Sequence, residues 1–221
     1  MNFSQASQGV ENAKSFLRSY TQIDCIAVKE RRSTITWQGR SPGVFKNVYY
    51  PLEYQYLVDN QQYSLLLSDS SFFQFYYLFD LEGLVSARLA YYPKPLSTGD
   101  SIETLVDAAD RALDRSDDNL YEHLYNSVEL LEIKGRAPSN SSHLRFDFDR
   151  KVTTHSQSHI QFSGVQEYRI PADCYPLPLA FVQACIPILP EGAVGEIGNL
   201  SFERNNMLKI DRPNSVIVLS G

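Results

Sequence analysis

The spacing of apolar residues changes several times along the chain and predicts where its elements lie. Apolar residues recur at helical spacing from about Ser7 to Tyr20, which predicts an N-terminal helix. After this segment the spacing shortens to two, so that Ile23, Cys25 and Ala27 alternate with polar positions. We therefore expect two strands in this region, joined at residues 29–33.

The segment between Tyr49 and Tyr92 consists of aromatic and β-branched stretches divided by short polar breaks. The stretches are EYQYLVD, QYSLLLSD, SFFQFYYLFD and LVSARLAYYP. Such stretches favour strands, and short connections favour antiparallel neighbours. The pattern predicts a β-meander across this whole segment.

Helical spacing returns in the second half of the chain. Asp100 and Glu103 resemble a capping box, and a helical apolar stripe follows them. A second helix is predicted from the stripe formed by Leu120, Leu124, Val128 and Leu131. The strictly alternating segments 143–149 and 159–163 predict two more strands, and a short apolar helix is expected at about 179–186.

Together these elements predict an α+β fold, with helices packed on an antiparallel β-meander. We expect an N-terminal helix within residues 1–22 and a β-rich half over 23–97. A second, smaller α+β half is expected over 98–190, followed by a tail over 191–221.

Composition narrows the function classes. The chain is 43% hydrophobic and 21% charged, which is typical of a globular protein. Its net charge of −6 argues against a protein that binds nucleic acid through an overall basic field. Three widely spaced cysteines without a CxxC motif favour neither a disulfide framework nor a zinc knuckle. Since no signal-peptide pattern or long apolar run is present, we expect a cytoplasmic protein without a membrane segment.

The stretch LRFDFDRKVTTHSQSHIQFSG, residues 144–164, carries the strongest candidate chemistry. A hairpin formed by its two strands would bring Asp147 or Asp149 near His159. Carboxylate and imidazole groups can bind a divalent metal, for which Mg²⁺ and Mn²⁺ are the candidate ions, with Asp147 and His159 as ligands. They can equally act as an acid–base pair, so Asp147, Asp149, His155 and His159 are the candidate catalytic residues.

A simpler interpretation of this stretch is a solvated sheet face on which Arg145 pairs with an aspartate. The HxxxH spacing of His155 and His159 adds little support for zinc, because the intervening SQS does not predict a helix. Both interpretations stay open at this point.

The only basic cluster surrounds the predicted turn at residues 29–33. Lys29, Arg31 and Arg32 could contact phosphates, and Trp37 could stack on a base. The alternative is a solvated hairpin tip, with the tryptophan serving the core.

Several motifs occur in an order that resembles the bacterial domain-of-unknown-function family 2290, over residues of about 50 to 190. The matching positions are Ser71–Gln74–Tyr77, Arg145–Asp147–Asp149, His155–Ser158–His159 and Arg169–Ile170–Pro171. Members of this family are found beside a helicase in anti-phage defence modules. The resemblance therefore implies a regulatory, sensor or adaptor subunit with a helicase partner, which reaches nucleic acid through that partner. The alternatives are a metal-dependent nuclease effector using the Asp/His hairpin, and a toxin-like protein neutralised by complex formation. The resemblance supplies no catalytic residues.

Overall fold

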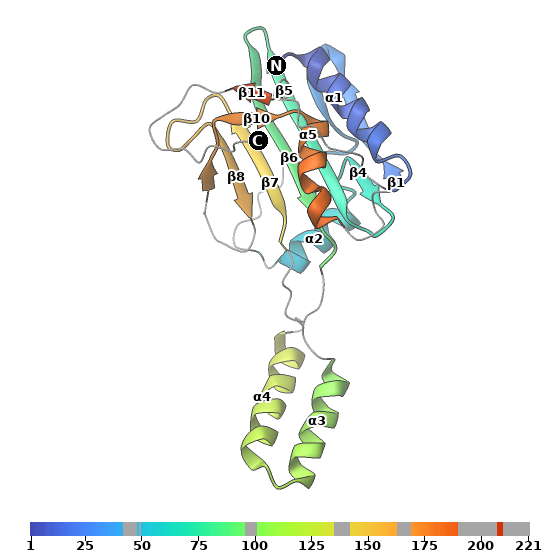
Figure 1. The fold of residues 1–221 in the computed structure, drawn as a ribbon, viewed down its shortest axis with the longest axis vertical. Coiled ribbons are helices and arrows are strands. Elements are labelled where there is room, and N and C mark those ends of the chain that lie inside the picture. The colour runs from blue at the N-terminus through green and yellow to red at the C-terminus, as the bar shows by residue number, and fades with distance from the viewer. Residues whose placement is uncertain are drawn as a thin grey trace. The chain divides into compact units, whose positions relative to one another are not determined.

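The computed structural model describes residues 1–41, 48, 50–95, 101–134, 142–162, 169–189 and 207–209. The chain divides into two compact units (Figure 1). One unit contains Met1–Lys94 and Ser142–Gly221, and the other contains Pro95–Ser141.

The first unit is built around a nine-stranded antiparallel sheet. Its strands run in the order β1-β4-β5-β6-β7-β8-β9, and β3, which also pairs with β2, joins the sheet at β5. The α+β prediction is confirmed, because helices accompany an antiparallel sheet. Most neighbours in that sheet are also neighbours in sequence, as a meander requires. The strands are β1 (Thr21–Asp24), β2 (Ile26–Lys29), β3 (Thr34–Trp37), β4 (Leu65–Leu67), β5 (Phe72–Asp80), β6 (Gly83–Tyr92), β7 (Leu144–Asp149), β8 (Ser158–Phe162) and β9 (Arg169–Pro171). A separate pair consists of β10 (Cys174–Pro176) and β11 (Met207–Lys209).

Helices α1 (Phe3–Phe16) and α5 (Pro178–Cys185) cover one face of this sheet (Figure 1). The large side chains that β5 and β6 direct to this face are fully buried, among them Phe73, Phe75 and Leu89. Alternation along each strand produces this core, because every second side chain points to the same face. The predicted N-terminal helix and the short apolar helix are therefore both present.

The two helices approach closely where α1 carries a glycine. A Cβ atom added to Gly9 would lie 2.8 Å from Cδ of Pro178, which is shorter than real contacts allow. Gly9 thus lets the first turn of α5 pack directly against the backbone of α1.

Helix α2 (Tyr50–Asp59) corrects the prediction of a strand at EYQYLVD. Tyr50, Tyr54 and Leu57 lie at helical spacing and are buried in a second core cluster on the other face of the sheet. The ring of Tyr54 lies 5.6 Å from that of Phe72, centroid to centroid, and Tyr50 stacks with Tyr92 at 6.4 Å. The aromatic content suggested a strand, but its i, i+4, i+7 spacing suits a helix lying on the sheet.

The strand predicted across residues 23–27 is divided at Cys25. The segment before Cys25 pairs with β4 and the segment after it pairs with β3, so one stretch of sequence serves two neighbours. Between β2 and β3 the chain forms a short 3-10 helix, η1 (Glu30–Arg32), instead of a simple turn.

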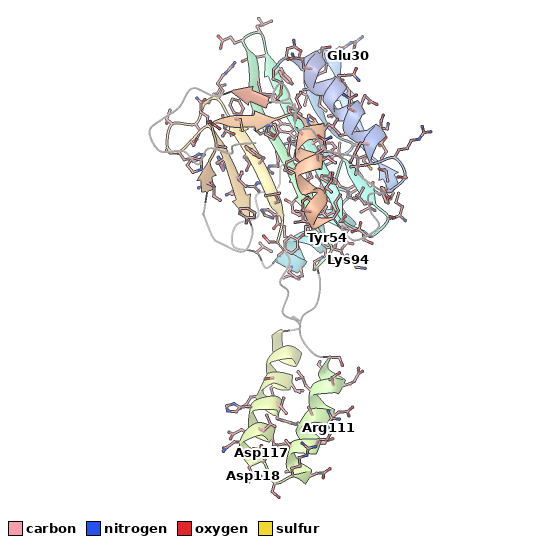
Figure 2. All side chains as sticks on the ribbon, in the orientation of Figure 1. Glu30, Tyr54, Lys94, Arg111, Asp117 and Asp118 are labelled. Carbon is pink, nitrogen blue, oxygen red and sulfur yellow. The ribbon has the colours of Figure 1, made fainter. Side chains whose placement is uncertain are left out.

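The second unit is a helical hairpin formed by α3 (Ile102–Asp114) and α4 (Asp118–Lys134), with Asp117 and Asp118 at its turn (Figure 2). Both helices were predicted. The helix cap is Ser101, whose hydroxyl accepts from the backbone N–H of Thr104 at 3.1 Å, and not Asp100, which lies outside the described residues. Most of the expected tail also lies outside the described residues, with β11 as the exception. None of the described helices is long and apolar enough to cross a membrane.

Candidate functional site

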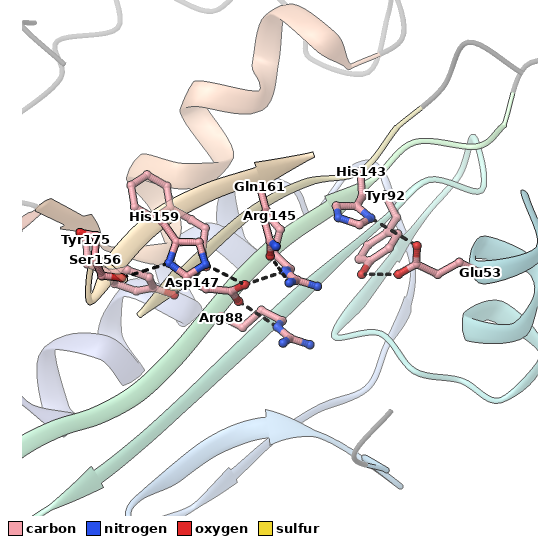
Figure 3. Close-up of polar contacts among 11 residues, drawn as sticks. Glu53, Arg88, Tyr92, His143, Arg145, Asp147, Ser156, His159, Gln161 and Tyr175 are labelled. Atoms are coloured by element: carbon pink, nitrogen blue, oxygen red, sulfur yellow. Dashed lines mark hydrogen bonds and ion pairs between the residues drawn. The ribbon is translucent and has the colours of Figure 1, made fainter. Parts of the chain in front are cut away.

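The sheet face opposite α1 and α5 is covered by α2 at one end and carries polar side chains over β6, β7 and β8 (Figure 3). Strand pairing puts Arg88 opposite Asp147 and Asp147 opposite His159. In a neighbouring row Arg145 lies opposite Gln161. These residues line an open pocket of about 360 Å³. The predicted alternation of segment 143–149 is confirmed, because Phe146 and Phe148 of the same strand are buried in the core, and so is the pairing of 143–149 with the strand that carries His159.

Asp147 is the centre of this polar face. Its Oδ1 accepts from Nε of Arg88 at 3.0 Å, and its Oδ2 accepts from Nε of Arg145 at 2.7 Å. Burial acts to raise the pKa of the Asp147 carboxyl, but the positive charges of Arg145 and Arg88 outweigh burial and hold the pKa below its ordinary value. The carboxylate is therefore charged at neutral pH and is held by two guanidinium groups.

Two histidines border Asp147. Nε2 of His159 lies 3.9 Å from Oδ2 of Asp147, while Nδ1 of His159 and Nδ1 of His155 lie 3.3 Å and 2.9 Å from the carbonyl oxygen of Ser156. The two imidazole rings meet edge to face, with centroids 4.9 Å apart. Burial lowers the pKa of His159, although Asp147 opposes that shift. His155 is exposed at the same pocket.

Two further arginines, Arg40 and Arg169, line the pocket. The Arg40 guanidinium lies 3.9 Å from the centroid of the Tyr76 ring, which is the geometry of a cation–π contact. Among the described residues, neither Arg40 nor Arg169 has a carboxylate within ion-pair distance. Sequence reasoning counted Arg40 with the basic cluster near residues 29–33 and did not place it in this pocket, and it missed Arg88 as a site residue. The available signal for Arg88 was that it is the only charged residue of β6, whose other side chains are mostly apolar.

The four predicted catalytic residues all line this pocket. Asp149 lies at its exposed edge, where its carboxylate accepts from the backbone N–H of Lys151 at 2.8 Å. Their catalytic role stays a prediction. The Arg145–aspartate pair expected of a solvated face is also present, with Asp147 as the aspartate.

The arrangement suits an anion better than a cation. Both oxygens of Asp147 already accept from arginines, so a metal ion would have to compete with two positive charges. Within the described part of the chain, no group of three or more histidine, cysteine, aspartate or glutamate side chains could hold a metal ion. The binding of Mg²⁺ or Mn²⁺ by Asp147 and His159 stays a prediction.

The predicted basic cluster lies elsewhere. Lys29, Arg31 and Arg32 are exposed around η1 and do not line the pocket. The Trp37 side chain is only 3% exposed, and its indole N–H donates to Oε1 of Gln62 at 3.2 Å, so its ring packs in the second core cluster.

A second cluster of buried polar side chains joins α2 to the sheet near this face. Nδ1 of His143 lies 3.5 Å from Oε2 of Glu53, and the Tyr92 hydroxyl donates to Oε1 of Glu53 at 3.4 Å (Figure 3). These side chains are separate from the lining of the pocket, so the third histidine of the region serves α2 packing.

The comparisons with known proteins identify a family and nothing more specific. The family described as an uncharacterized conserved protein, DUF2290, matches residues 18–186 of the 221, which is well over half of the chain. The chain belongs to this family. No curated protein and no solved structure matches it.

Proposed function

We propose that this member of the DUF2290 family binds the phosphate groups of single-stranded nucleic acid in the pocket on the open face of its sheet. The observation that carries the proposal is that four arginines, at positions 40, 88, 145 and 169, line one pocket in which the aspartates are Asp147 and Asp149. Arginine is the side chain best suited to phosphate, because its planar fork donates two parallel hydrogen bonds.

The net charge of the chain does not oppose this proposal. Residues 102–134 hold nine acidic and three basic residues, a net charge of −6, which equals the charge of the whole chain. The remaining residues therefore hold 17 of each sign and are neutral in sum. An anion approaching the sheet unit meets the local excess of arginines instead of an acidic surface.

The size and setting of the pocket favour a single strand over a duplex. A volume of about 360 Å³ suits a group the size of one nucleotide. Open sheet faces that present aromatic and basic side chains are a common way to hold single strands, whereas a duplex needs a longer basic surface.

The wider role that we propose is that of a regulatory, sensor or adaptor subunit of an anti-phage defence module. Its support is the helicase neighbourhood that the family resemblance implies. A helicase partner would supply single strands to the pocket, and this would link the two proposals.

Binding of labelled oligonucleotides, followed by fluorescence anisotropy across a series of salt concentrations, tests the pocket. Arg40 and Arg169 are suitable targets because both are exposed and have no carboxylate partner among the described residues. We expect Arg40→Ala with Arg169→Ala to weaken binding about tenfold per arginine and to reduce the salt slope by about two.

The matched control removes the same charge from the other basic cluster. Arg31→Ala with Arg32→Ala changes two exposed arginines of η1, outside the pocket. Binding should be nearly unchanged in this control. Equal losses in both double variants, or a loss only in the η1 variant, would contradict the pocket as the binding site.

The competing proposal is a metal-dependent nuclease, for which the 3.9 Å distance between His159 and Asp147 is the supporting observation. A bound ion stabilises the native state, so Mg²⁺ or Mn²⁺ should then raise the melting temperature, and Asp147→Asn should abolish the rise. Thermal shift measurements with both ions test this. If phosphate binding is the function, each ion should change the melting temperature of the wild type and that of the Asp147→Asn protein by the same amount.

A further inference from the structure

The paired histidines of the pocket have a property that phosphate binding does not require. Their Nδ1 atoms lie near the same acceptor, the carbonyl oxygen of Ser156. Because a carbonyl only accepts, both Nδ1 atoms must donate and carry protons. This arrangement leaves Nε2 as the atom of each ring that is available for proton transfer.

The two rings differ in their surroundings. His159 is only 6% exposed, and burial favours its neutral form, in which Nε2 holds a lone pair. Oδ2 of Asp147 lies 3.9 Å from that same Nε2 atom, where its charge would stabilise the imidazolium formed when Nε2 takes up a proton. His155 is exposed and borders the same pocket, where it can exchange protons with solvent. The environments suit a buried base and an accessible acid.

Besides a base and an acid, phosphoryl chemistry requires cationic groups near the phosphate, and the arginines supply them. Negative charge accumulates on the phosphate oxygens in the transition state, and fixed cationic donors stabilise it. Arg88 and Arg145 are held in place by Asp147, and Arg40 is held against Tyr76, so three guanidinium groups are positioned before any ligand binds. A base, an acid and positioned cations thus line one pocket.

We propose that this pocket cleaves RNA by transesterification without a metal ion, an inference that rests on the proposed binding of nucleic acid. Nε2 of His159 removes the proton of a ribose 2′-hydroxyl, and the 2′-oxygen forms a bond to phosphorus. The bond between phosphorus and the 5′-oxygen of the next nucleotide breaks, and protonated His155 delivers a proton to the departing oxygen. The products are a 2′,3′-cyclic phosphate and a free 5′-hydroxyl, and exchange with water restores both histidines.

In this reaction Asp147 is a positioning residue. It orients Arg88 and Arg145 and stabilises the protonated form of His159, without itself exchanging a proton. DNA lacks the 2′-hydroxyl that attacks, so the proposal separates the two nucleic acids in a simple way: the pocket holds either strand and cleaves only RNA.

The experiment incubates the full chain with RNA and DNA oligonucleotides of the same sequence, in the presence of EDTA, and identifies the products by mass spectrometry. We expect cleavage of RNA alone, with 2′,3′-cyclic phosphate ends and a bell-shaped dependence of rate on pH. His155→Ala should lower the rate by about 100-fold or more, with an unchanged circular dichroism spectrum as the sign that it is folded.

Two further variants test whether the loss of cleavage is specific to the histidines of the pocket. His123→Ala makes the same substitution at an exposed position of α4, and should cleave at the wild-type rate. His159→Gln removes the base and should lose cleavage as His155→Ala does, with an unchanged circular dichroism spectrum as the sign that it is folded.

Each contrary result has a separate meaning. DNA binding without RNA cleavage would overturn this inference and leave the proposed function standing, whereas the absence of binding would remove both. Cleavage that EDTA abolishes would support the metal-dependent nuclease instead. Cleavage that persists equally in the His155 and His159 variants would show a contaminating nuclease and would also overturn the inference.

Discussion

Replacing Asp147 by asparagine should destabilise the protein while strengthening its hold on phosphate. The Asp147 carboxylate lies between Arg88 and Arg145 and is 15% exposed. Asparagine has nearly the same shape but keeps one acceptor oxygen and carries no charge. One arginine therefore keeps a hydrogen bond to a neutral acceptor, and the other arginine loses its partner.

The expected loss of stability follows from how far these groups are buried. Breaking a fully buried ion pair costs about 3–5 kcal/mol, and a hydrogen bond to a charged group contributes about 1.5–3 kcal/mol. The side chains of Arg88 and Arg145 are 36% and 19% exposed, so solvent compensates for part of the loss. We expect a cost of about 2 kcal/mol, which corresponds to a melting temperature lower by about 4–8 °C in a unit of this size.

The pH dependence of this difference has a definite sign. Because the pKa of Asp147 is lowered in the folded protein, its contribution is present above the unfolded pKa of about 3.9 and is lost as the pH falls through the lower folded pKa. The wild type should therefore exceed the variant in stability at neutral pH and at about pH 5. The difference should begin to shrink below about pH 4 and should vanish only when the pH falls below the lowered folded pKa.

The effect on binding should have the opposite sign. Removing a negative charge some 6 Å from a bound phosphate, at an effective dielectric constant of about 40, relieves about 1.4 kcal/mol of repulsion and tightens binding roughly tenfold. Asp147→Ala is the comparison, because it frees both arginines from their orienting acceptor and should bind more weakly than Asp147→Asn.

Urea unfolding monitored by circular dichroism measures the first effect, and oligonucleotide anisotropy measures the second. A variant with unchanged stability at neutral pH would refute the ion-pair argument. Loss of oligonucleotide binding in a folded Asp147→Asn protein would refute the assignment of the pocket to an anion, since a metal-bridged ligand would behave in that way.

Three further predictions concern the described core. Gly9→Ala should destabilise the protein by about 1–3 kcal/mol in urea unfolding, because the added methyl overlaps Pro178; the stabilisation expected from helix propensity alone would contradict this packing. Trp37→Phe should cost about 1 kcal/mol, through the lost hydrogen bond to Gln62, and should leave oligonucleotide binding unchanged; weaker binding would mean that the indole contacts the ligand. Cys185 is fully buried and burial raises the pKa of its thiol, so it should react with Ellman's reagent at mildly alkaline pH only after unfolding; rapid reaction in the native protein would show that α5 opens locally.

The spacing of apolar residues correctly predicted the type of element, and which of its side chains are buried, wherever one side of the element faces the core and the other faces solvent. Alternation in segment 143–149 predicted which side chains of β7 point inward, and helical spacing predicted α3 and α4. It failed at EYQYLVD, because aromatic residues suit either a strand or a helix, and the choice depends on the surface they cover. That surface is formed by Phe72 and Tyr92, and strand pairing brings these two rings together.

The pocket shows most clearly what local sequence leaves open. The hairpin that places Asp147 opposite His159 follows from alternation and a short connection, and these are properties of one stretch of chain. The arginine partner of Asp147 on β6 is 59 positions away, and the α3–α4 hairpin lies between them in the sequence. Which strand lies beside β7, and in which register, depends on how the apolar faces of distant strands bury one another against α1 and α5. Sequence periodicity therefore determined the face on which each polar group lies, while the packing of the sheet determined that arginines surround the carboxylate, which is the basis of the proposed anion site.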